Sequence, residues 1–383
     1  MAEMFDVLIL GGGAGGLVTA NELRKKLPDK FKIALIDKSE QHLFYPSLLW
    51  LITGKRDENK IQKPLSLLKR KGIEFIKGEI VKIDPLNKQV NVDQKTYQGR
   101  FLVIALGADL QPESISGLSE SGHNLYTLEG ANEIKEKLKS FDSGHLVVFV
   151  APPPYKCPAA PYEAMLLLEE SFHKKGLGNK VKLSLYAGEA GPMGVAGVEL
   201  SNAVRGLVEN KGVEYYPEHI LTEVKDKVLS FTNGKKVPFD LFFYVPPHKA
   251  PEVVKNAGLT DSSGWIPVNV NTLETSFKDI YAIGDITVIP LPLGKPLPKA
   301  GVFAHNEAEV VAHNIAVSLN NSGILKSFNG DGECFLEIGY GKAGYAKGNF
   351  YASPKPSVRM SAPGYRWHIG KIGFEKWWMW KWF

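Results

Sequence analysis

The chain has 383 residues with 44% hydrophobic content, which is enough for two or three packed domains. Its net charge of +5 is mild, and no cluster of Lys and Arg in the body of the chain indicates nucleic-acid binding. No apolar run approaches the ~20 residues of a membrane-spanning helix, and no signal peptide is expected, because a strand is predicted within the first few residues. The two cysteines are too few for a disulfide scaffold and can form one pair.

The N-terminal residues predict a β-turn-α-β unit. Phe5–Leu10 is an apolar strand that runs into the small residues GGGAGG. A helix is expected over Leu17–Lys26, and a second strand over Lys32–Ile36 ends at Asp37. This order of elements is typical of a dinucleotide-binding unit.

The glycines of that turn have the G-x-G-x-x-G spacing on Gly11, Gly13 and Gly16. The first permits a tight turn, the second lets the backbone approach a pyrophosphate, and the third packs the helix on the strand. The helix N-terminus adds free N–H groups and a positive dipole end. Asp37 follows roughly 20 residues later, where a dinucleotide site places the acid that accepts from a ribose hydroxyl.

The next segments continue the same domain. His42–Leu49 (HLFYPSLL) is expected to lead from a loop into a helix. A small antiparallel excursion is predicted over Ile76–Asp84 and Gln89–Asp93. Phe101–Leu106 is an apolar run that predicts a buried strand, which ends at Gly107.

Residues 108–270 predict a second unit with alternating strands and helices. The expected strands are Leu146–Val150, Lys182–Ala187, Val213–Tyr216 and Leu241–Val245, and the expected helices are Tyr162–His173 and Val198–Lys211. After this unit, a short strand over Asp279–Ile283 and a helix over Val302–Leu319 can complete the first sheet. The predicted fold is therefore α/β, with two Rossmann-like dinucleotide-binding domains, the second inserted into the first. The expected boundaries are 1–107, 108–270, 271–325 and 326–383.

The predicted second unit lacks the glycine fingerprint. The loop after its first strand, Ala151–Glu163 (APPPYKCPAAPYE), contains five prolines and Cys157 instead. Ala187–Gly197 is rich in glycine but lacks the required spacing. We therefore expect one bound dinucleotide, and a redox thiol where a second phosphate site would lie.

The C-terminal segment combines aromatic and basic residues. From Tyr351 to Phe383 there are six Lys/Arg against one acid, and five of the seven tryptophans lie there. Tryptophan favours the membrane interface and lysine favours anionic headgroups. We expect a membrane-interface tail that contacts lipid through Trp377, Trp378, Trp380, Trp382, Lys376 and Lys381. A C-terminal helix docked on the core or on a partner subunit is the alternative.

Several segments together resemble the sulfide:quinone oxidoreductases and the related flavoprotein subunit of flavocytochrome c sulfide dehydrogenase. They are GGGAGG, ALGAD, KCPAAPYEA, IYAIGD, PKAGVFAHNEAEVVAHNI and FEKWWMWKW. KCPAAPYE and PKAGVFAH are the specific ones, since other flavoprotein families share the flavin motifs. The resemblance implies FAD as cofactor. The cofactor-binding residues that it implies are Gly11, Gly13 and Gly16 at the pyrophosphate, Asp37 at the ribose, Gly284 and Asp285 at the ribityl–phosphate portion, Pro46, Gly107, Lys299 and Gly301 near the flavin ring.

The resemblance also implies that Cys157 and Cys334 are redox cysteines. Sulfide would attack a disulfide or trisulfide between them, leave a persulfide and a thiolate, and pass its electrons through the flavin to a membrane quinone. Glu163 is a candidate proton handler, or an acid that stabilises a helix N-terminus. Many members carry a third cysteine before the position of Cys157, and this chain has none there.

Other interpretations stay open at this stage. The chain could be a sulfide dehydrogenase subunit that passes electrons to a haem partner, a type II NADH:quinone oxidoreductase, or a non-enzymatic flavin-binding protein. His305 and His313 lie on roughly one helix face, but no carboxylate or cysteine completes a site with them, so no metal is expected. We expect a peripheral membrane protein, and the sequence leaves homo-oligomerisation open.

Overall fold

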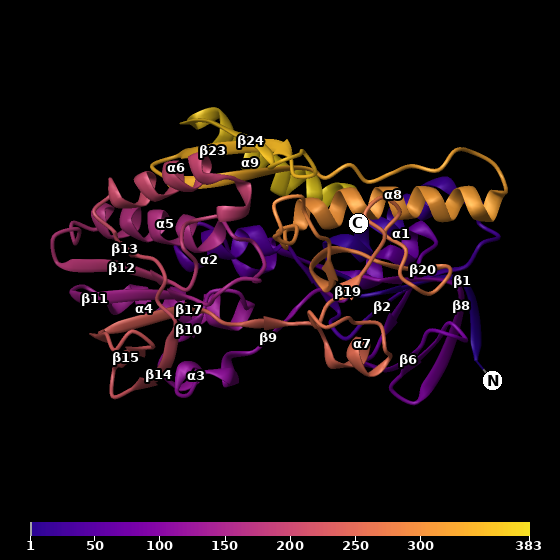
Figure 1. The fold of residues 1–383 in the computed structure, drawn as a ribbon, viewed down its shortest axis with the longest axis horizontal. Helices are drawn as coiled ribbons and strands as arrows, with labels where there is room; N and C mark the ends of the chain where they lie inside the picture. The colour runs from indigo at the N-terminus through magenta and orange to yellow at the C-terminus, as the bar shows by residue number, and fades with distance from the viewer. Residues whose placement is uncertain (1) are drawn as a thin grey trace.

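Apolar runs form the strands of a first parallel sheet. The structure is a computed structural model that describes residues 2–383. The parallel part of this sheet consists, in spatial order, of β5 (Glu74–Lys77), β2 (Ile33–Asp37), β1 (Glu3–Leu10), β8 (Lys95–Ile104) and β20 (Ile280–Ala282). α1 (Ala14–Lys26) and α8 (Gly301–Asn320) pack against each other over this sheet (Figure 1). The helix, strand and turn predicted for the N-terminal unit are thus present.

A hairpin of β6 (Ile80–Asp84) and β7 (Gln89–Val92) extends from the first part of β8 as an antiparallel branch. The sequence prediction treated Ile76–Asp84 as one antiparallel element. The structure divides it at Gly78, because Glu74–Lys77 pairs in parallel with β2 before the chain turns into the hairpin.

The second unit is a separate parallel sheet between β8 and β20 in the chain, so it is inserted into the first, as predicted. Its strands, in spatial order, are β10 (His123–Asn124), β17 (Leu241–Val245), β11 (Gly144–Val150), β12 (Val181–Ala187) and β13 (Glu214–Tyr216). α4 (Leu128–Ser140), α5 (Ala160–Lys174) and α6 (Val198–Glu209) belong to this unit. A three-stranded antiparallel sheet adjoins it, formed by β14 (Leu221–Lys225), β15 (Val228–Phe231) and β16 (Lys236–Pro238).

The two chain segments that connect the units pair with each other, through β9 (Asp109–Leu110) and β18 (His248–Lys249). They cross together between the two sheets (Figure 1). The other short strands are β3 (Gln41–Leu43) with β4 (Gln62–Pro64), and β19 (Ile266–Pro267) with β21 (Thr287–Val288). The other short helices are α2 (Leu48–Ile52), α3 (Leu118–Ser121) and α7 (Glu252–Asn256).

The C-terminal region forms an antiparallel sheet and a final helix. The sheet consists of β22 (Asp331–Gly339), β23 (Lys342–Asn349) and β24 (Ser357–Gly364), and the helix is α9 (Tyr365–Lys381). The sequence prediction contained no sheet here, because strands such as KAGYAKGN lack the apolar runs by which strands are recognised. Within residues 2–383, no helix has both the length and the apolar character required to cross a bilayer.

α9 has an unusual distribution of side chains. Its inward face buries Lys371, Glu375, Trp378 and Trp382, while its outward face exposes Ile369 (66%) and Trp380 (75%). The inward face thus holds two charged groups among aromatic rings, and the outward face exposes large apolar side chains beside Lys376. The expectation that Trp378 and Trp382 contact lipid is wrong, because both rings pack in the protein core.

His42 fastens α9 to the glycine-rich turn. The indole Nε1–H of Trp378 can only donate, so Nε2 of His42 accepts from it at 3.0 Å. Nδ1 of His42 must then carry the proton and donate to the carbonyl oxygen of Gly12 at 2.9 Å. His42 is buried and neutral in this arrangement.

We predict that acid weakens the docking of α9 through His42. Burial lowers the pKa of His42 to about 4 from its ordinary 6.5, so its contribution is complete above pH 6.5 and is lost as the pH falls through about 4. The full loss is about 3 kcal/mol. Protection factors of α9 amides in hydrogen exchange should fall over this range. His42→Gln keeps a donor and an acceptor but does not titrate, so an equally steep pH dependence in this variant would contradict the prediction.

Candidate active site

The glycine-rich turn lies at the carboxyl end of β1, where parallel sheets bind their ligands. A Cβ on Gly16 would overlap the carbonyl oxygen of Gly11, so the turn and α1 are in contact only because Gly16 lacks a side chain, and a Cβ on Gly11 would overlap the carbonyl oxygen of Ala105. A Cβ on Gly13 would meet no protein atom within 4 Å, which leaves open space in front of α1. No side chain caps the N-terminus of α1, and its first turn holds no acid. This turn therefore fits a pyrophosphate.

Asp37 lies beside the same turn, at the end of β2. One carboxylate oxygen accepts from the Gly12 N–H at 2.5 Å, and the other accepts from the Ser39 N–H at 2.7 Å. Each oxygen has two lone pairs, so both can accept further hydrogen bonds, as from a ribose. The position agrees with the sequence prediction for Asp37.

The N-terminus of α8 faces the same crevice. Ala300 is its N-cap residue without a side-chain cap, and a Cβ on Gly301 would meet open space. Lys299 precedes it and is buried. Its ammonium donates to the carbonyl oxygens of Asp285 and Thr287 at 2.7 and 3.0 Å. The Lys299 side chain is thus engaged within its own loop, and the backbone at residues 299–301 is what remains available to a flavin.

Burial shifts the ionisation of three groups in this loop cluster. It lowers the pKa of Lys299 to about 8, although Asp285 and Glu307 partly offset the effect. It raises the pKa of Asp285, and it raises the pKa of Glu307 to about 7. Glu307 accepts from the Gly284 N–H at 2.6 Å. The sequence analysis missed Glu307, because one acid among several in a helix gives no signal that it is buried.

Cys157 lies in the loop between β11 and α5 and is held at both backbone groups. Its N–H donates to the carbonyl oxygen of Lys299 at 2.7 Å, and its own carbonyl oxygen accepts from the Tyr126 hydroxyl at 2.9 Å. Its φ of 50° lies in the left-handed region, a conformation that costs a residue with a side chain of order 1–3 kcal/mol. The bond to Lys299 joins this loop to the segment that precedes α8, so the thiol of the second unit is positioned against the crevice of the first.

Cys334 reaches the same place on β22, which packs against α5. Both cysteines are free and half-buried. Burial raises the pKa of Cys157 to about 12 and raises that of Cys334 still further, to which the proximity of Cys157 adds.

A buried ion pair lies beside the two cysteines. Oε1 of Glu163, on α5, accepts from Lys371 Nζ on α9 at 2.6 Å and from the Glu337 N–H on β22 at 2.6 Å. Burial raises the pKa of Glu163, which Lys371 only partly offsets, and the carboxylates of Glu163 and Glu337 outweigh burial to raise the pKa of Lys371. The sequence analysis counted Lys371 only as a basic tail residue, because its partner is 208 positions away in the chain.

Pro46 and Gly107 complete the predicted set. Pro46 lies in the 3-10 turn Tyr45–Ser47, and the ammonium of Lys156 lies 4.6 Å from the Tyr45 ring centre, which places this turn next to the Cys157 loop. Gly107 follows β8 with φ of 70° and borders open space. His305 does not belong to this set of residues, because its ring packs against the tail residues Trp377, Trp378 and Trp382.

Two tyrosines of the second unit bind the acid that follows its second strand. Glu189 follows β12, where a Rossmann unit places its acid. Its Oε1 accepts from the hydroxyls of Tyr155 and Tyr162, both at 2.5 Å. Tyr155 comes from the proline-rich loop that stands where a glycine turn would be. The chain's own side chains therefore bind one oxygen of the acid that a second nucleotide would use.

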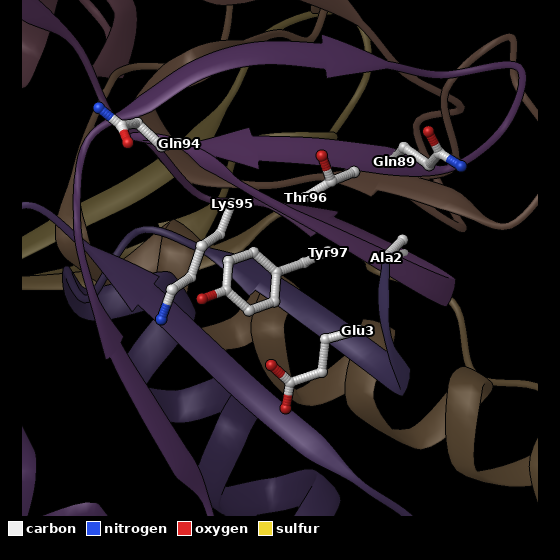
Figure 2. A pocket seen from close by; sticks show the side chains of 7 residues that line it. All are labelled: Ala2, Glu3, Gln89, Gln94, Lys95, Thr96 and Tyr97. Carbon is white, nitrogen blue, oxygen red and sulfur yellow. The ribbon is translucent and has the colours of Figure 1, made fainter.

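A hollow of about 510 Å³ lies away from this site (Figure 2). Its lining residues are Ala2, Glu3, Gln89, Gln94, Lys95, Thr96 and Tyr97, from β1, β7 and β8. It lies at the amino end of β1, opposite the edge where parallel sheets bind ligands. Among the residues that the structure describes, no group of three His, Cys, Asp or Glu side chains is arranged to hold a metal ion.

Comparison with known proteins agrees with this geometry. The sequence matches the pyridine nucleotide-disulphide oxidoreductase family over residues 5–149 and 168–308. The sulfide-quinone reductase of Aquifex aeolicus is 30% identical over 395 residues, which cover 98% of this chain and 90% of the relative. The chain belongs to the pyridine nucleotide-disulphide oxidoreductase family and, within it, to the sulfide:quinone oxidoreductases. Its members are FAD-binding flavoproteins, so FAD is the cofactor of this protein.

Two further members support the same placement. Mouse mitochondrial sulfide:quinone oxidoreductase is 26% identical, over 91% of this chain and 79% of its own length. The X-ray structure of the sulfide:quinone oxidoreductase from Aquifex aeolicus has a TM-score of 0.89 at 28% identity, and covers 100% of this chain and 91% of that one. The two segments that match the broader family leave out residues 150–167, which contain Cys157. The resemblance inferred from the motifs and the predicted fold class are confirmed.

We predict that two glycine substitutions separate cofactor binding from folding. Gly16→Ala should destabilise the protein itself by about 2–3 kcal/mol, because the new methyl group overlaps backbone. Gly13→Ala should leave the flavin-free protein as stable as the wild type but weaken FAD binding, because its methyl group enters only the open space. Urea unfolding of the flavin-free proteins and FAD titration measure the two effects. Normal FAD affinity in Gly13→Ala would show that the pyrophosphate lies elsewhere.

Proposed function

We propose that the protein oxidises sulfide to zero-valent sulfur or polysulfide and passes the electrons to a membrane quinone. The proposal is supported by the chain's membership of the sulfide:quinone oxidoreductase family and by the surroundings of the cysteines: the charge of Cys157 acts on Cys334, and the Cys157 N–H binds the segment that precedes α8. In this proposal residues 1–107 and 271–325 form the FAD-binding domain. Residues 108–270 supply Cys157, and residues 326–383 supply Cys334 and the tail.

The sulfur step is thiol–disulfide exchange on the cysteine pair. In the oxidised protein the two sulfurs are joined directly or through a third sulfur. When they are joined directly, hydrosulfide attacks one sulfur, one S–S bond forms and one breaks, and the products are a persulfide on one cysteine and a thiolate on the other. When a third sulfur lies between them, the same attack on one cysteine sulfur leaves a persulfide on each cysteine. Bound FAD supplies the two-electron acceptor that a quinone can reoxidise.

The leaving thiolate needs stabilisation, because both sites are desolvated. Burial raises the pKa of both thiols, and the positive charge of Lys371 opposes this at each of them. The Ala160 N–H, at the start of α5, also favours the Cys157 thiolate. Lys371 thus acts on both cysteines whichever one becomes the leaving group.

Glu163 supplies a proton acceptor beside the two cysteines. Its negative charge raises the pKa of both cysteines, which places the carboxylate near each sulfur. One of its oxygens already accepts two hydrogen bonds, from Lys371 and Glu337. The other oxygen can take the proton that hydrosulfide or a persulfide releases. In this role Glu163 both positions the elements around the cysteines and handles a proton.

The surroundings of the site favour quinone over the two alternative partners. The missing glycine fingerprint of the second unit, together with the two tyrosine hydroxyls on Oε1 of Glu189, disfavours a nicotinamide nucleotide there. The exposed face of α9, with Ile369, Trp377 and Trp380 beside Lys376, suits a bilayer better than a soluble haem protein. We infer peripheral membrane attachment through this face.

We predict that Cys157→Ser and Cys334→Ser each abolish sulfide oxidation while FAD stays bound. Sulfide should bleach the flavin of the wild type under anaerobic conditions, and a short-chain quinone should restore its absorbance. Each variant should bleach at least about 1000-fold more slowly, and the double variant should be no slower than either single one, because the two sulfurs act as a unit. Unimpaired bleaching in both single variants would rule out the cysteine mechanism.

A second prediction separates the two roles of the ion pair. Lys371→Met alone should cost about 3–5 kcal/mol of unfolding free energy, since it leaves the Glu163 charge buried without its partner. Adding Glu163→Gln removes that charge and should restore most of the stability. The double variant should still bleach slowly with sulfide, with the rate rising toward higher pH, because its thiolates have lost their cation. If the double variant recovered both the stability and the bleaching rate of the wild type, the Glu163–Lys371 pair would have a structural role only.

A further inference from the structure

A cationic hollow lies beside the tail. It has a volume of about 300 Å³ and lies where α1, the 3-10 segment Leu65–Lys71 and the end of α9 meet. Its lining includes Asn21, Glu22, Lys25, Lys71, Lys381 and Trp382. The sequence analysis assigned these residues no function other than a basic, aromatic tail.

The hollow holds positive charge that the protein does not neutralise. Glu22, its one acid, is paired with Lys26. Arg24 also lines it, but its guanidinium donates to three backbone carbonyl oxygens. Lys25, Lys71 and Lys381 remain, and none of the three forms an ion pair within residues 2–383.

Lys71 has a donor to spare. Its ammonium donates to the side-chain oxygen of Asn21 at 2.8 Å and to the carbonyl oxygen of Lys381 at 2.9 Å. An ammonium carries three N–H groups, so one is left for a ligand. Burial also lowers the pKa of Lys71, a penalty that an anion in the hollow would relieve.

The hollow is continuous with the exposed face of α9. The ammonium of Lys381 lies 4.5 Å from the ring centre of Trp377 and 4.3 Å from that of Trp382. Trp377 belongs to the face that also exposes Ile369 and Trp380, so an anion in the hollow would lie at the edge of that face. Tryptophans at a membrane surface lie at headgroup depth, which is where lipid phosphates are.

We propose that the hollow binds the headgroup of an anionic phospholipid, while Trp377 and Trp380 enter the same leaflet. This inference rests on the proposed membrane contact of α9 and gives it a lipid preference. Three unpaired lysines complement a phosphate, and the adjoining aromatic face suits a lipid better than a free anion.

Sedimentation with two kinds of vesicle tests the proposal, one of phosphatidylcholine alone and one of three parts phosphatidylcholine to one part phosphatidylglycerol, at one ionic strength. Three forms of the holoprotein are compared. They are the wild type, a hollow variant that combines Lys25→Gln with Lys381→Gln, and a matched control variant that combines Lys225→Gln with Lys236→Gln on the β14–β16 sheet. These control lysines are exposed, as Lys25 is, while Lys381 is half-buried, and neither control lysine has an ion-pair partner among the described residues. Reduction of a soluble short-chain quinone should be unchanged in both.

We expect the wild type to bind the mixed vesicles more tightly than the neutral ones. The hollow variant should lose about 30-fold in affinity for the mixed vesicles and nothing on neutral ones, while the control should lose less than about threefold. Trp380→Ser should weaken binding to both kinds. Equal losses in the two lysine variants would overturn the headgroup site in favour of diffuse attraction. If the wild type bound both kinds of vesicle equally well, the headgroup site would be overturned but the membrane contact of α9 would stand. If it bound neither kind, the headgroup site and the membrane contact would both be overturned.

Discussion

The buried ion pair between Glu163 and Lys371 holds the active site together. It joins α5, which follows Cys157, to α9, and the Glu337 N–H adds β22, which carries Cys334. Separating two charges inside a protein costs several kcal/mol, so these three elements cannot drift apart independently. The two sulfurs come from segments 177 positions apart in the chain, and this pair fixes the elements that bring them together. The same cation eases formation of a thiolate at either sulfur.

α9 connects the two cysteines to the glycine-rich turn. Its inward charges satisfy partners in the core: Lys371 binds Glu163, and Glu375 binds Arg56 and the Ser47 hydroxyl. Trp378 reaches the glycine-rich turn through His42. Its outward face exposes Ile369 and Trp380 to solvent. The proposed contact with a bilayer would cover these apolar side chains.

The second unit shows how a nucleotide-binding fold can carry different chemistry. Its parallel strands and crossover helices remain, but the turn after β11 holds Cys157 in a left-handed conformation instead of a glycine. Hydrogen bonds to Lys299 and from Tyr126 stabilise that conformation from both sides. Tyr155 and Tyr162 then satisfy Glu189, the acid at the end of β12. The fold thus keeps its scaffold while a cysteine takes the place of the glycine turn, which is where we propose that the sulfur chemistry occurs.

The sequence alone determined what depends on local pattern: the glycine turn with Asp37, the two α/β units, the inserted order, and the unusual Cys157 loop. These follow from short spacings, because a turn or an apolar strand is decided by neighbours in the chain. The tertiary structure decided what depends on distant partners. Lys371, Glu307 and His42 carry no local mark of burial, and Trp378 and Trp382 look the same in sequence as Trp377 and Trp380. Which tryptophans face the core and which charges pair is set by packing across hundreds of residues.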